Sequence, residues 1–479
     1  MFIQGKKIRF VGIGGMGMSA LAAFCHEFGA TVSGSDAKTS EETRRLQSLG
    51  ISVTIGADAQ KAEGADLVVF SSAIDASHPE LKKAREKGIK TMERHEFLAL
   101  ISGMFSCVVA IGGTHGKTSV SAMLTHILLK SETRFVAMIG GESVEFANYV
   151  NNTSATCVDE LKNCIFVCEA CEYKRNLLSL DPSVAAVTNA ECDHPDCYKS
   201  QKDVTDTFSQ FLEKARCKIV SEEYEFLLQE NEKRVGESRN EKCGNFCVEI
   251  FSDDKIERLY ADIKNDKAEV VFGGNLVGTI RLKDGGEYNY QNATFALAMS
   301  RRLGIDLRFA IDALSTFKGV KRRFEYVGNV DGARVIFDFA HHPSEIKQAL
   351  KRASEQGDVL CIFQPHTYSR TKAYLDDFVS VLGDERNGVK TLAIMPTYAA
   401  REDKSMGLDS GELAIAIFDE FCNRDVYLLK NAQSTVDFVK RHAKEHAVVL
   451  MLGAGDIYDL KDKLPYDKLP YDKLSDDKA

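Results

Sequence analysis

The sequence of 479 residues contains no apolar run long enough to cross a bilayer. It also lacks an excess of positive charge: the formal net charge is −9, which argues against nucleic acid or an anionic membrane as the main partner. No signal peptide is expected, because Gly12, Gly14 and Gly15 interrupt the first apolar stretch. What remains is a globular protein, 44% apolar and long enough for two to four domains.

A second pair of metal-binding cysteines is lacking as well. Cys164, Cys168 and Cys171 have a spacing that would suit zinc, but no matching pair follows, and the segment is predicted to be a strand. We therefore expect reduced cysteines in the core, Cys107 and Cys361 among them. Reduced thiols indicate a reducing cytoplasm as the compartment.

The most informative stretch that is present is Gly-Thr-His-Gly-Lys-Thr at residues 113–118. It follows an apolar, β-branched run at 107–111, which predicts a buried strand, and a helix is expected directly afterwards. Its glycines let backbone amides approach a phosphate at the helix N-terminus. The motif is a shortened P-loop, since Ile111 replaces the first glycine of the full pattern. The nucleotide-binding residues expected here are Gly113, Thr114, His115, Gly116, Lys117, Thr118 and Ser119, with Lys117 on the β- and γ-phosphates and Thr118 on magnesium.

Residues 7–36 predict the βαβ start of a Rossmann-type domain. A strand at 7–13 leads into Gly-x-Gly-Gly-x-Gly at 12–17, a helix reaches residue 28, and a second strand ends at Asp36. Alone, this pattern suggests NAD or FAD and an oxidoreductase. A further strand ends at Ser71 and Ser72, at the sheet edge where open α/β sheets bind ligands.

Alternating strands and helices predict an α/β protein of three domains, at 1–104, 105–322 and 323–462. The middle domain has expected strands at 163–169 and 184–189, a charged helix-prone surface stretch at 221–242, a β-rich insertion at 250–282 and a helix at 288–303. The third has a mostly parallel sheet, with strands at 334–339, 359–364, 391–395 and 447–452 and helices at 344–355 and 371–382. The tail, 463–479, repeats Lys-Leu-Pro-Tyr-Asp and is predicted to be disordered.

Polar side chains end two strands of the middle domain. Glu169 and His194 are well placed beside the phosphate loop to hold a divalent metal, which accepts carboxylate and imidazole ligands. Asn189 could meet a phosphate. Asn289 and Asn292 share one helix face, where an amide suits an adenine edge.

The third domain carries a comparable set at two strand ends. His341 and His342 follow one strand, and His366 and Arg370 follow the next. Arg370 is a natural clamp for a carboxylate or phosphate, because a guanidinium binds either in a bidentate manner. For the paired histidines, substrate contact and helix capping are favoured over a metal site.

In this order the motifs resemble those of the Mur ligases, over about residues 7–460. The Gln-Pro-His-Thr-Tyr-Ser-Arg-Thr string at 364–371 resembles the alanine-adding branch. The other matching strings begin at Gly12 (GIGGMGMS), Ser71 (SSAI), Gly113 (GTHGKT), Glu169 (EACEY), Thr188 (TNAECDH), Gly319 (GVKRRF), Ala340 (AHHP) and Gly453 (GAGD).

The resemblance implies a UDP-sugar-binding domain, an ATP-binding domain and a C-terminal domain that closes over the site. It implies that ATP and Mg²⁺ drive ligation of L-alanine to the lactyl carboxylate of UDP-N-acetylmuramate through an acyl phosphate, in peptidoglycan synthesis. It implies no nucleic-acid or membrane partner, and either a monomer or a homodimer. The implied catalytic residues are Lys117, Glu169, His194 and Arg370, and the implied metal ligands are Thr118, Glu169 and His194. The implied nucleotide contacts beyond the loop are Asn292, Arg323 and Asp338, and the implied substrate contacts are Gly14, Gly15, Gly17, Ser71, His341, His342, His366 and Arg370.

Two alternatives stay open at this point. One is a murein-peptide ligase that attaches a tripeptide to the same sugar, and the other is a nucleotide-binding regulator without turnover. The sequence departs from the family pattern at Phe339, where tyrosine is expected, and at Tyr288, where histidine is expected.

Overall fold

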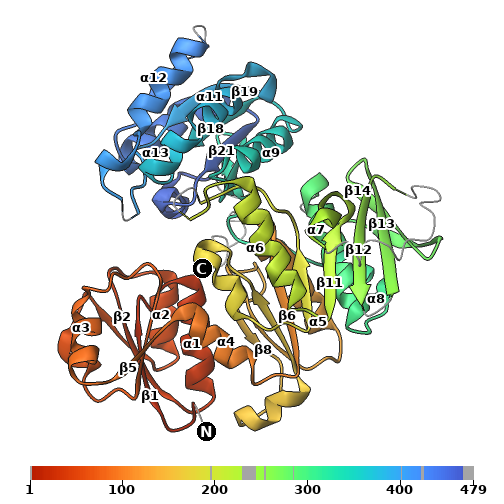
Figure 1. Cartoon of the computed structure of the whole chain (residues 1–479). Coiled ribbons are helices and arrows are strands. Elements are labelled where there is room, and N and C mark those ends of the chain that lie inside the picture. The colour runs from red at the N-terminus through yellow and green to blue at the C-terminus, as the bar shows by residue number, and fades with distance from the viewer. Residues whose placement is uncertain are drawn as a thin grey trace, which may run out of the picture. The chain divides into compact units, whose positions relative to one another are not determined.

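The computed structural model describes residues 3–194, 197–228, 244–252, 255–283, 285–400, 402–421 and 425–467. They form three successive sheets with helices on them, which confirms the predicted three-part α/β fold (Figure 1). By their contacts the residues group into two compact units, one ending at Val320 and one beginning at Lys321, and Asp193 and His194 group with the second unit. None of the helices in the described ranges is both long and apolar enough to span a membrane.

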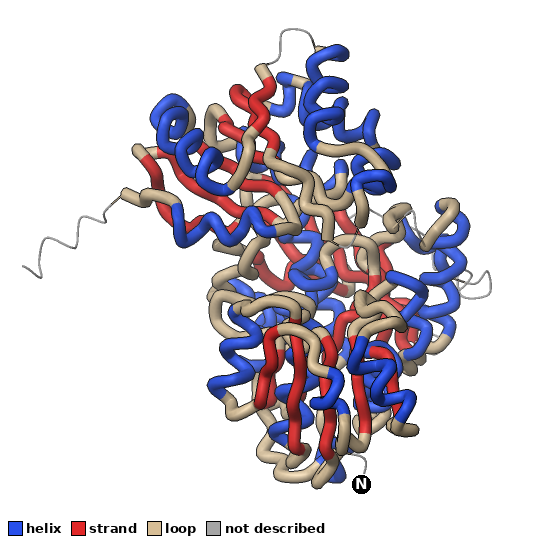
Figure 2. The backbone as a smooth tube through the Cα atoms, turned by 90° about the vertical axis from the view of Figure 1, so that its left-hand side faces the viewer, coloured by secondary structure: helices blue, strands red, loops and turns tan. Residues whose placement is uncertain are grey.

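The first sheet is parallel, with strand order β3-β2-β1-β4-β5. Helices flank its strands (Figure 2). The order reverses between β1 and β4, and open α/β sheets bind ligands at the carboxyl ends of the strands at such a point. Its elements are β1 Lys7–Val11, α1 Met16–Glu27, β2 Thr31–Asp36, α2 Glu41–Ser48, β3 Ser52–Ile55, β4 Leu67–Phe70, α3 Pro79–Glu86, β5 Lys90–Glu93 and α4 Arg94–Ser102.

The second sheet has the order β15-β14-β13-β12-β11-β10-β6-β9-β7-β8. Its middle strands β11, β10, β6, β9 and β7 run parallel, and β12–β15 continue it as an antiparallel meander. The expected β-rich insertion is therefore an extension of the central sheet. Its elements are β6 Cys107–Gly112, α5 Lys117–Lys130, β7 Phe135–Met138, β8 Tyr149–Asn151, β9 Ile165–Glu169, β10 Val184–Val187, α6 Gln201–Glu213, β11 Cys217–Ser221, β12 Phe246–Ser252, β13 Lys255–Lys264, β14 Lys267–Phe272, β15 Asn275–Ile280, α7 Glu287–Arg302 and α8 Leu307–Ser315.

The charged stretch at 221–242 is only partly described. Residues Glu222–Leu227 form a 3-10 helix, and Leu227 and Leu228 are buried, so this end is not a purely surface segment. The remainder of the predicted stretch lies outside the described residues.

The third sheet has the order β16-β17-β21-β18-β19-β20 and is parallel except for the β16–β17 pair, as predicted. The helix expected at 371–382 is instead two helices that meet at Tyr374, where φ is −118°. Its elements are β16 Glu325–Val330, β17 Ala333–Asp338, α9 Pro343–Ser354, β18 Val359–Phe363, α10 Tyr368–Ala373, α11 Leu375–Gly383, β19 Val389–Ile394, α12 Ser410–Glu420, β20 Val426–Leu428, α13 Ala432–His442 and β21 Val448–Leu452.

The first Lys-Leu-Pro-Tyr-Asp copy, expected to be disordered, packs on the turn between β16 and β17. Leu464 is buried in the core of this unit, and the carboxylate of Asp467 accepts hydrogen bonds from the N–H groups of Asp331 and Gly332, each at 2.9 Å. The expectation of disorder is wrong for residues 463–467. Contacts with the rest of this unit order the segment, although its own composition does not favour a folded structure. The second copy lies outside the described residues.

The cysteines considered for zinc have the environment predicted for core thiols. Cys164 and Cys168 are buried and are not disulfide-bonded. Burial raises the pKa of Cys168 to about 12, so in the absence of metal the group is a neutral thiol.

A buried ion pair joins the first strand to α3 and yields a stability prediction. Arg9 Nε donates to Glu80 at 2.9 Å, and both side chains are almost completely inaccessible. Arg9→Met leaves the Glu80 carboxylate buried without its partner, so we expect the free energy of unfolding to fall by about 3–5 kcal/mol in urea denaturation. Lys83→Met, which breaks a solvent-exposed pair with Glu63, is the control and should change little. Equal effects of the two substitutions would contradict the expectation.

Candidate active site

The phosphate loop connects β6 to α5 and depends on two glycines with positive φ. Gly113 has φ 127° and Gly116 has φ 84°. A Cβ atom on Gly113 would lie 2.1 Å from Thr188 Oγ1, and one on Gly116 would lie 2.6 Å from Asn292 Oδ1. Both the backbone conformation and the lack of space therefore require glycine. The loop ends where α5 begins, so the helix N-terminus faces it, as predicted for an anion site.

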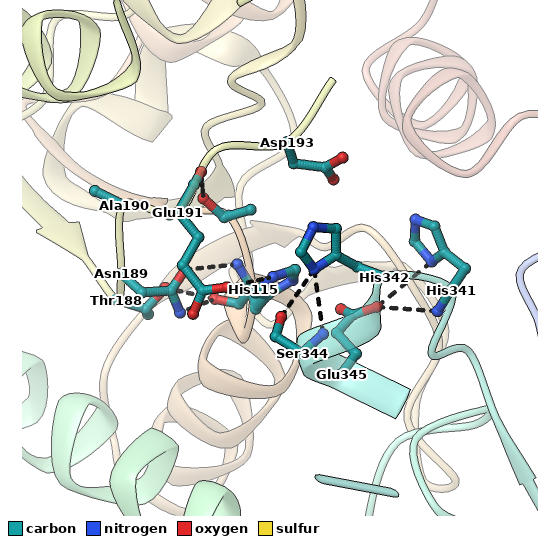
Figure 3. Close-up of polar contacts among 12 residues, drawn as sticks. His115, Thr188, Asn189, Ala190, Glu191, Asp193, His341, His342, Ser344 and Glu345 are labelled. Carbon is teal, nitrogen blue, oxygen red and sulfur yellow. Dashed lines mark hydrogen bonds and ion pairs between the residues drawn. The ribbon is translucent and has the colours of Figure 1, made fainter. Parts of the chain in front are cut away.

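The segment that follows β10 braces this loop from the neighbouring strand. The His115 N–H donates to Asn189 Oδ1 at 2.8 Å, and Asn189 Nδ2 donates to the His115 carbonyl at 3.1 Å. Thr188 Oγ1 donates to the same carbonyl at 2.5 Å, and Thr114 Oγ1 donates to the Glu191 carbonyl at 2.8 Å (Figure 3). Asn189, considered for phosphate contact, uses its side chain to shape the loop.

Lys117 folds its ammonium group back onto the loop. Lys117 Nζ donates to the carbonyls of Gly113 at 2.5 Å and Thr114 at 3.0 Å, and it lies 2.9 Å from Glu172 Oε2. Burial disfavours the charged ammonium, but the carboxylates of Glu172 and Glu169 outweigh it and raise the pKa of Lys117. The positive charge of Lys117 therefore lies, largely buried, at the phosphate loop. Sequence reasoning missed the pairing of Glu172 with Lys117.

Glu169 and Thr118, two of the three predicted metal ligands, are in contact. Thr118 Oγ1 donates to Glu169 Oε2 at 3.2 Å, and Ser121 Oγ donates to Glu169 Oε1 at 3.1 Å. The Gly140 N–H also donates to this carboxylate, and a Cβ atom on Gly140 would lie 2.5 Å from it. Sequence reasoning missed Gly140 and Ser121. The Gly140–Gly141 pair directly after β7 was the available signal.

Asn292 lies on α7 against the phosphate loop. A Cβ atom at Gly116 would clash with the amide oxygen of Asn292, and Asn292 is buried. Ser119 is buried in the first turn of α5. The structure thus brings Asn292 to the phosphate end of the predicted nucleotide site, where the sequence had suggested adenine.

The predicted substrate residues of the first sheet follow the carboxyl ends of β1 and β4. The Gly14 N–H donates to Asp36 Oδ2 at 2.8 Å, and Gly15 precedes α1. A Cβ atom on Gly12 would lie 3.4 Å from the Cβ of Ser71. The Asp36 carboxylate is therefore hydrogen-bonded to the glycine loop, whereas in a dinucleotide site the acid at this position binds the ribose hydroxyl.

The second unit holds the remaining predicted residues, beginning with Asp338 at the end of β17. Its carboxylate accepts the N–H groups of Phe324 and Ala340, each at 2.7 Å. Burial raises the pKa of Asp338 to about 6. Arg323 places its guanidinium 4.9 Å from the centre of the Phe339 ring and 3.9 Å from Glu345. Asp338 and Arg323 thus secure the start of the third domain, and their nucleotide contacts stay a prediction.

The neighbouring histidines His341 and His342 have different environments (Figure 3). The ring of His341 lies 5.4 Å from that of His366, and burial together with the charge of Arg370 lowers the pKa of His341 to about 3 and of His366 to about 4. Both rings are therefore neutral near pH 7. His342 caps α9, its Nδ1 lying 3.4 Å from the Ser344 N–H, so the capping expectation is confirmed for this residue.

Arg370 is paired with a carboxylate of the protein itself. Its Nη2 donates to Asp193 Oδ1 at 2.9 Å, while its buried Nε has no hydrogen-bond partner among the described residues. Burial would raise the pKa of Asp193, but Arg370 and His194 lower it below its ordinary value. The His194 N–H bonds the same carboxylate at 2.6 Å. His194 groups with the second unit and Glu169 with the first, so only Thr118 and Glu169 of the three predicted metal ligands are in contact, and the metal site stays a prediction.

Comparison with known proteins identifies the family. The sequence matches the Mur ligase family catalytic domain over residues 7–106, the Mur ligase middle domain over 111–300 and the Mur ligase glutamate ligase domain over 322–455. It is 34% identical to a UDP-N-acetylmuramate–L-alanine ligase of Clostridium novyi, over 95% of this chain and 96% of that protein. It is 35% identical to the enzyme of the same name from Clostridium beijerinckii, over 96% and 97%.

Solved structures agree on the fold. The UDP-N-acetylmuramate–alanine ligase of Thermotoga maritima has a TM-score of 0.76 at 24% identity, covering 96% of this chain and 98% of that one. A murein peptide ligase of Psychrobacter arcticus has a TM-score of 0.68 at 21% identity, with the same coverage. The resemblance found in the motifs is confirmed: the chain belongs to the Mur ligase family.

Proposed function

We propose that this protein joins L-alanine to the lactyl carboxylate of UDP-N-acetylmuramate with hydrolysis of ATP to ADP and phosphate, an early cytoplasmic step of peptidoglycan synthesis. The observation that carries the proposal is the phosphate loop with its buried Lys117 ammonium beside Glu172 and Glu169. Relatives named UDP-N-acetylmuramate–L-alanine ligase are about one third identical to this protein over 95–96% of its length. Whether the protein is a monomer or a homodimer stays a prediction.

The three sheets then have separate roles. The first holds the UDP-sugar, its diphosphate at the glycine loop Gly14–Gly17 and beside Ser71. The second holds ATP at residues 113–119 and Asn292. In the third, the side chains that bind the amino acid and the transferring phosphate are His341, His342, His366 and Arg370. Arg323 and Asp338, also in the third, contact the nucleotide.

The first chemical step is phosphoryl transfer. An oxygen of the lactyl carboxylate forms a bond to the γ-phosphorus, the bond from that phosphorus to the β–γ bridging oxygen breaks, and ADP leaves. Negative charge builds on the phosphoryl oxygens, and the Lys117 ammonium and the loop amides stabilise it. Because Thr188 and Asn189 fix the loop at His115, the loop amides need little reorganisation.

In the second step the nitrogen of L-alanine attacks the acyl carbon. The carbon–oxygen bond to phosphate then breaks, the amide forms, and the amine gives up a proton. An oxyanion forms at the acyl carbon on the way, so fixed cations are required again. Arg370 fits this role or that of a carboxylate clamp, because its buried Nε has no partner among the described residues.

The side chains at the end of β9 fit a hard divalent cation. Glu169 offers a carboxylate and Thr118 a hydroxyl, the oxygen ligands that Mg²⁺ prefers, and His194 is the third candidate. Bound Mg²⁺ would neutralise phosphate charge. Gly140 and Ser121 orient the Glu169 carboxylate through hydrogen bonds to it.

Lys117→Ala should lower the rate of ligation by ~10³-fold or more, because a preorganised donor to the transferring phosphoryl group is lost. The measurement is ADP release with UDP-N-acetylmuramate and L-alanine both present. Lys130→Ala, at the exposed end of the same helix, is the matched control and should retain activity. Near-normal turnover of Lys117→Ala would refute the role of Lys117.

Glu169→Gln tests the metal site. The substitution keeps the shape of the side chain and removes its charge, so the Mg²⁺ concentration for half-maximal activity should rise by about tenfold or more. Glu132→Gln, an exposed acid after α5, is the control. An unchanged Mg²⁺ requirement in Glu169→Gln would show that Glu169 is not a ligand.

A panel of amino acids tests the acceptor. ADP release should require UDP-N-acetylmuramate and L-alanine together. Stimulation by the tripeptide instead of L-alanine would favour the murein-peptide ligase, and equal stimulation by glycine or L-serine would leave the amino acid unassigned. Binding of ATP without release of ADP under any of these conditions would favour the non-catalytic regulator.

A further inference from the structure

Arg94 lies beside the glycine loop of the first sheet. It is the first residue of α4, directly after β5, and α4 contacts α1 (Figure 1). A Cβ atom on Gly17 would lie 3.1 Å from both Cδ and Nη1 of Arg94. The guanidinium therefore rests on the first turn of α1, and a side chain at position 17 would displace it.

The backbone that carries Arg94 is fixed from two sides. The Glu93 N–H donates to Glu96 Oε2 at 2.8 Å in a capping box at the start of α4. The 3-10 helix Tyr173–Ser179 contacts α4, and Ser179 Oγ lies 3.4 Å from the His95 carbonyl oxygen. This backbone thus joins the first sheet to the segment that follows Glu169 and Glu172, and it positions Arg94 before any ligand binds.

Arg94 has no acidic partner among the described residues. The side chain is half-buried, and no hydrogen bond or ion pair of its guanidinium is present among the described residues. By contrast, Arg9 and Arg370 are each paired with a buried acid. A guanidinium offers five N–H donors in a planar fork that matches a carboxylate or phosphate.

Arg94 and Asp36 lie at different parts of the glycine loop. Arg94 lies against Gly17 in the first turn of α1, whereas Asp36 accepts the Gly14 N–H from the β2 side. Helix α4, which begins at Arg94, also contacts the 3-10 helix that follows Glu172, the partner of Lys117.

We propose that Arg94 binds an oxyanion at the sugar end of the nucleotide-sugar substrate, either the distal phosphate or the lactyl carboxylate. The inference rests on the proposed function. With its phosphates on Gly14–Gly17, the substrate must send its acid toward Lys117 and Glu169, so the acid passes Arg94. An unpaired guanidinium at that place orients the nucleophilic carboxylate or the phosphate next to it.

The test measures binding to the full chain by calorimetry, with a non-hydrolysable ATP analogue present. The ligands are UDP, UDP-N-acetylglucosamine and UDP-N-acetylmuramate, and the variants are Arg94→Met and Arg94→Lys. Arg94→Met should weaken UDP-N-acetylmuramate binding by about tenfold or more, the loss of one charge-assisted hydrogen-bonded contact. Arg94→Lys should recover part of it. The KM for UDP-N-acetylmuramate should rise while the KM for ATP stays unchanged.

The three ligands separate the two sources of the oxyanion. Equal weakening of all three supports the proposal with the distal phosphate as the group bound, and weakening of UDP-N-acetylmuramate alone supports it with the carboxylate. Unchanged binding of all three in Arg94→Met overturns the inference.

Two controls make these outcomes interpretable. Lys90→Met removes one exposed positive charge at the other end of β5 and should bind every ligand normally. Binding of the ATP analogue by each variant reports a folded protein. If the unaltered protein binds no UDP-sugar, the proposed function fails, whereas normal wild-type binding with no effect of Arg94→Met removes only the role of Arg94.

Discussion

The ammonium of Lys117 is buried at the phosphate loop together with the carboxylate of Glu172, and the surrounding structure accommodates both charges. Burying an ion is costly unless it is paired and hydrogen-bonded, so Glu172 and the carbonyls of Gly113 and Thr114 are needed to keep the cation there. The cation in turn gives the loop the charge that a triphosphate requires. These groups come from β6 and β9, whose carboxyl ends are neighbours in a parallel sheet.

That pairing shows why the loop could be predicted from the sequence and its surroundings could not. The strand, glycine and helix signals around Gly116 and Lys117 are local and need no knowledge of the fold. Glu172, Ser121 and Gly140 belong to the site through contacts between segments far apart in the chain. A pattern of residues along one segment cannot specify which acid will face which cation. The predictions that failed have the same cause: residues 463–467 are ordered by the β16–β17 turn, which their own composition does not reveal.

For the third domain, the sequence predicted which residues belong to the site but not which residues they contact. Arg370, His341 and His366 were identified as candidates for anion contact, and the structure places them in one buried cluster with Asp193. Burial, together with the positive charge of Arg370, lowers the pKa of both histidines, and Asp193 compensates the charge of Arg370. A guanidinium already paired with a carboxylate can bind a second acid only through the donors that remain, and its buried Nε is one of these.

The segment at residues 139–148 explains how the first two sheets act as one unit. At one end the Gly140 N–H bonds Glu169, and at the other the buried amide of Asn148 donates to the Met16 carbonyl and to Ser19 Oγ at 2.9 Å on α1. Helix α1 is the one whose first turn carries Gly17 and contacts Arg94. A shift of the glycine loop relative to Glu169 must therefore break these hydrogen bonds, of which the one from Asn148 to Ser19 is buried and costs more to break than an exposed one. The separation between the glycine loop and the phosphate loop is thus held by contacts within the protein.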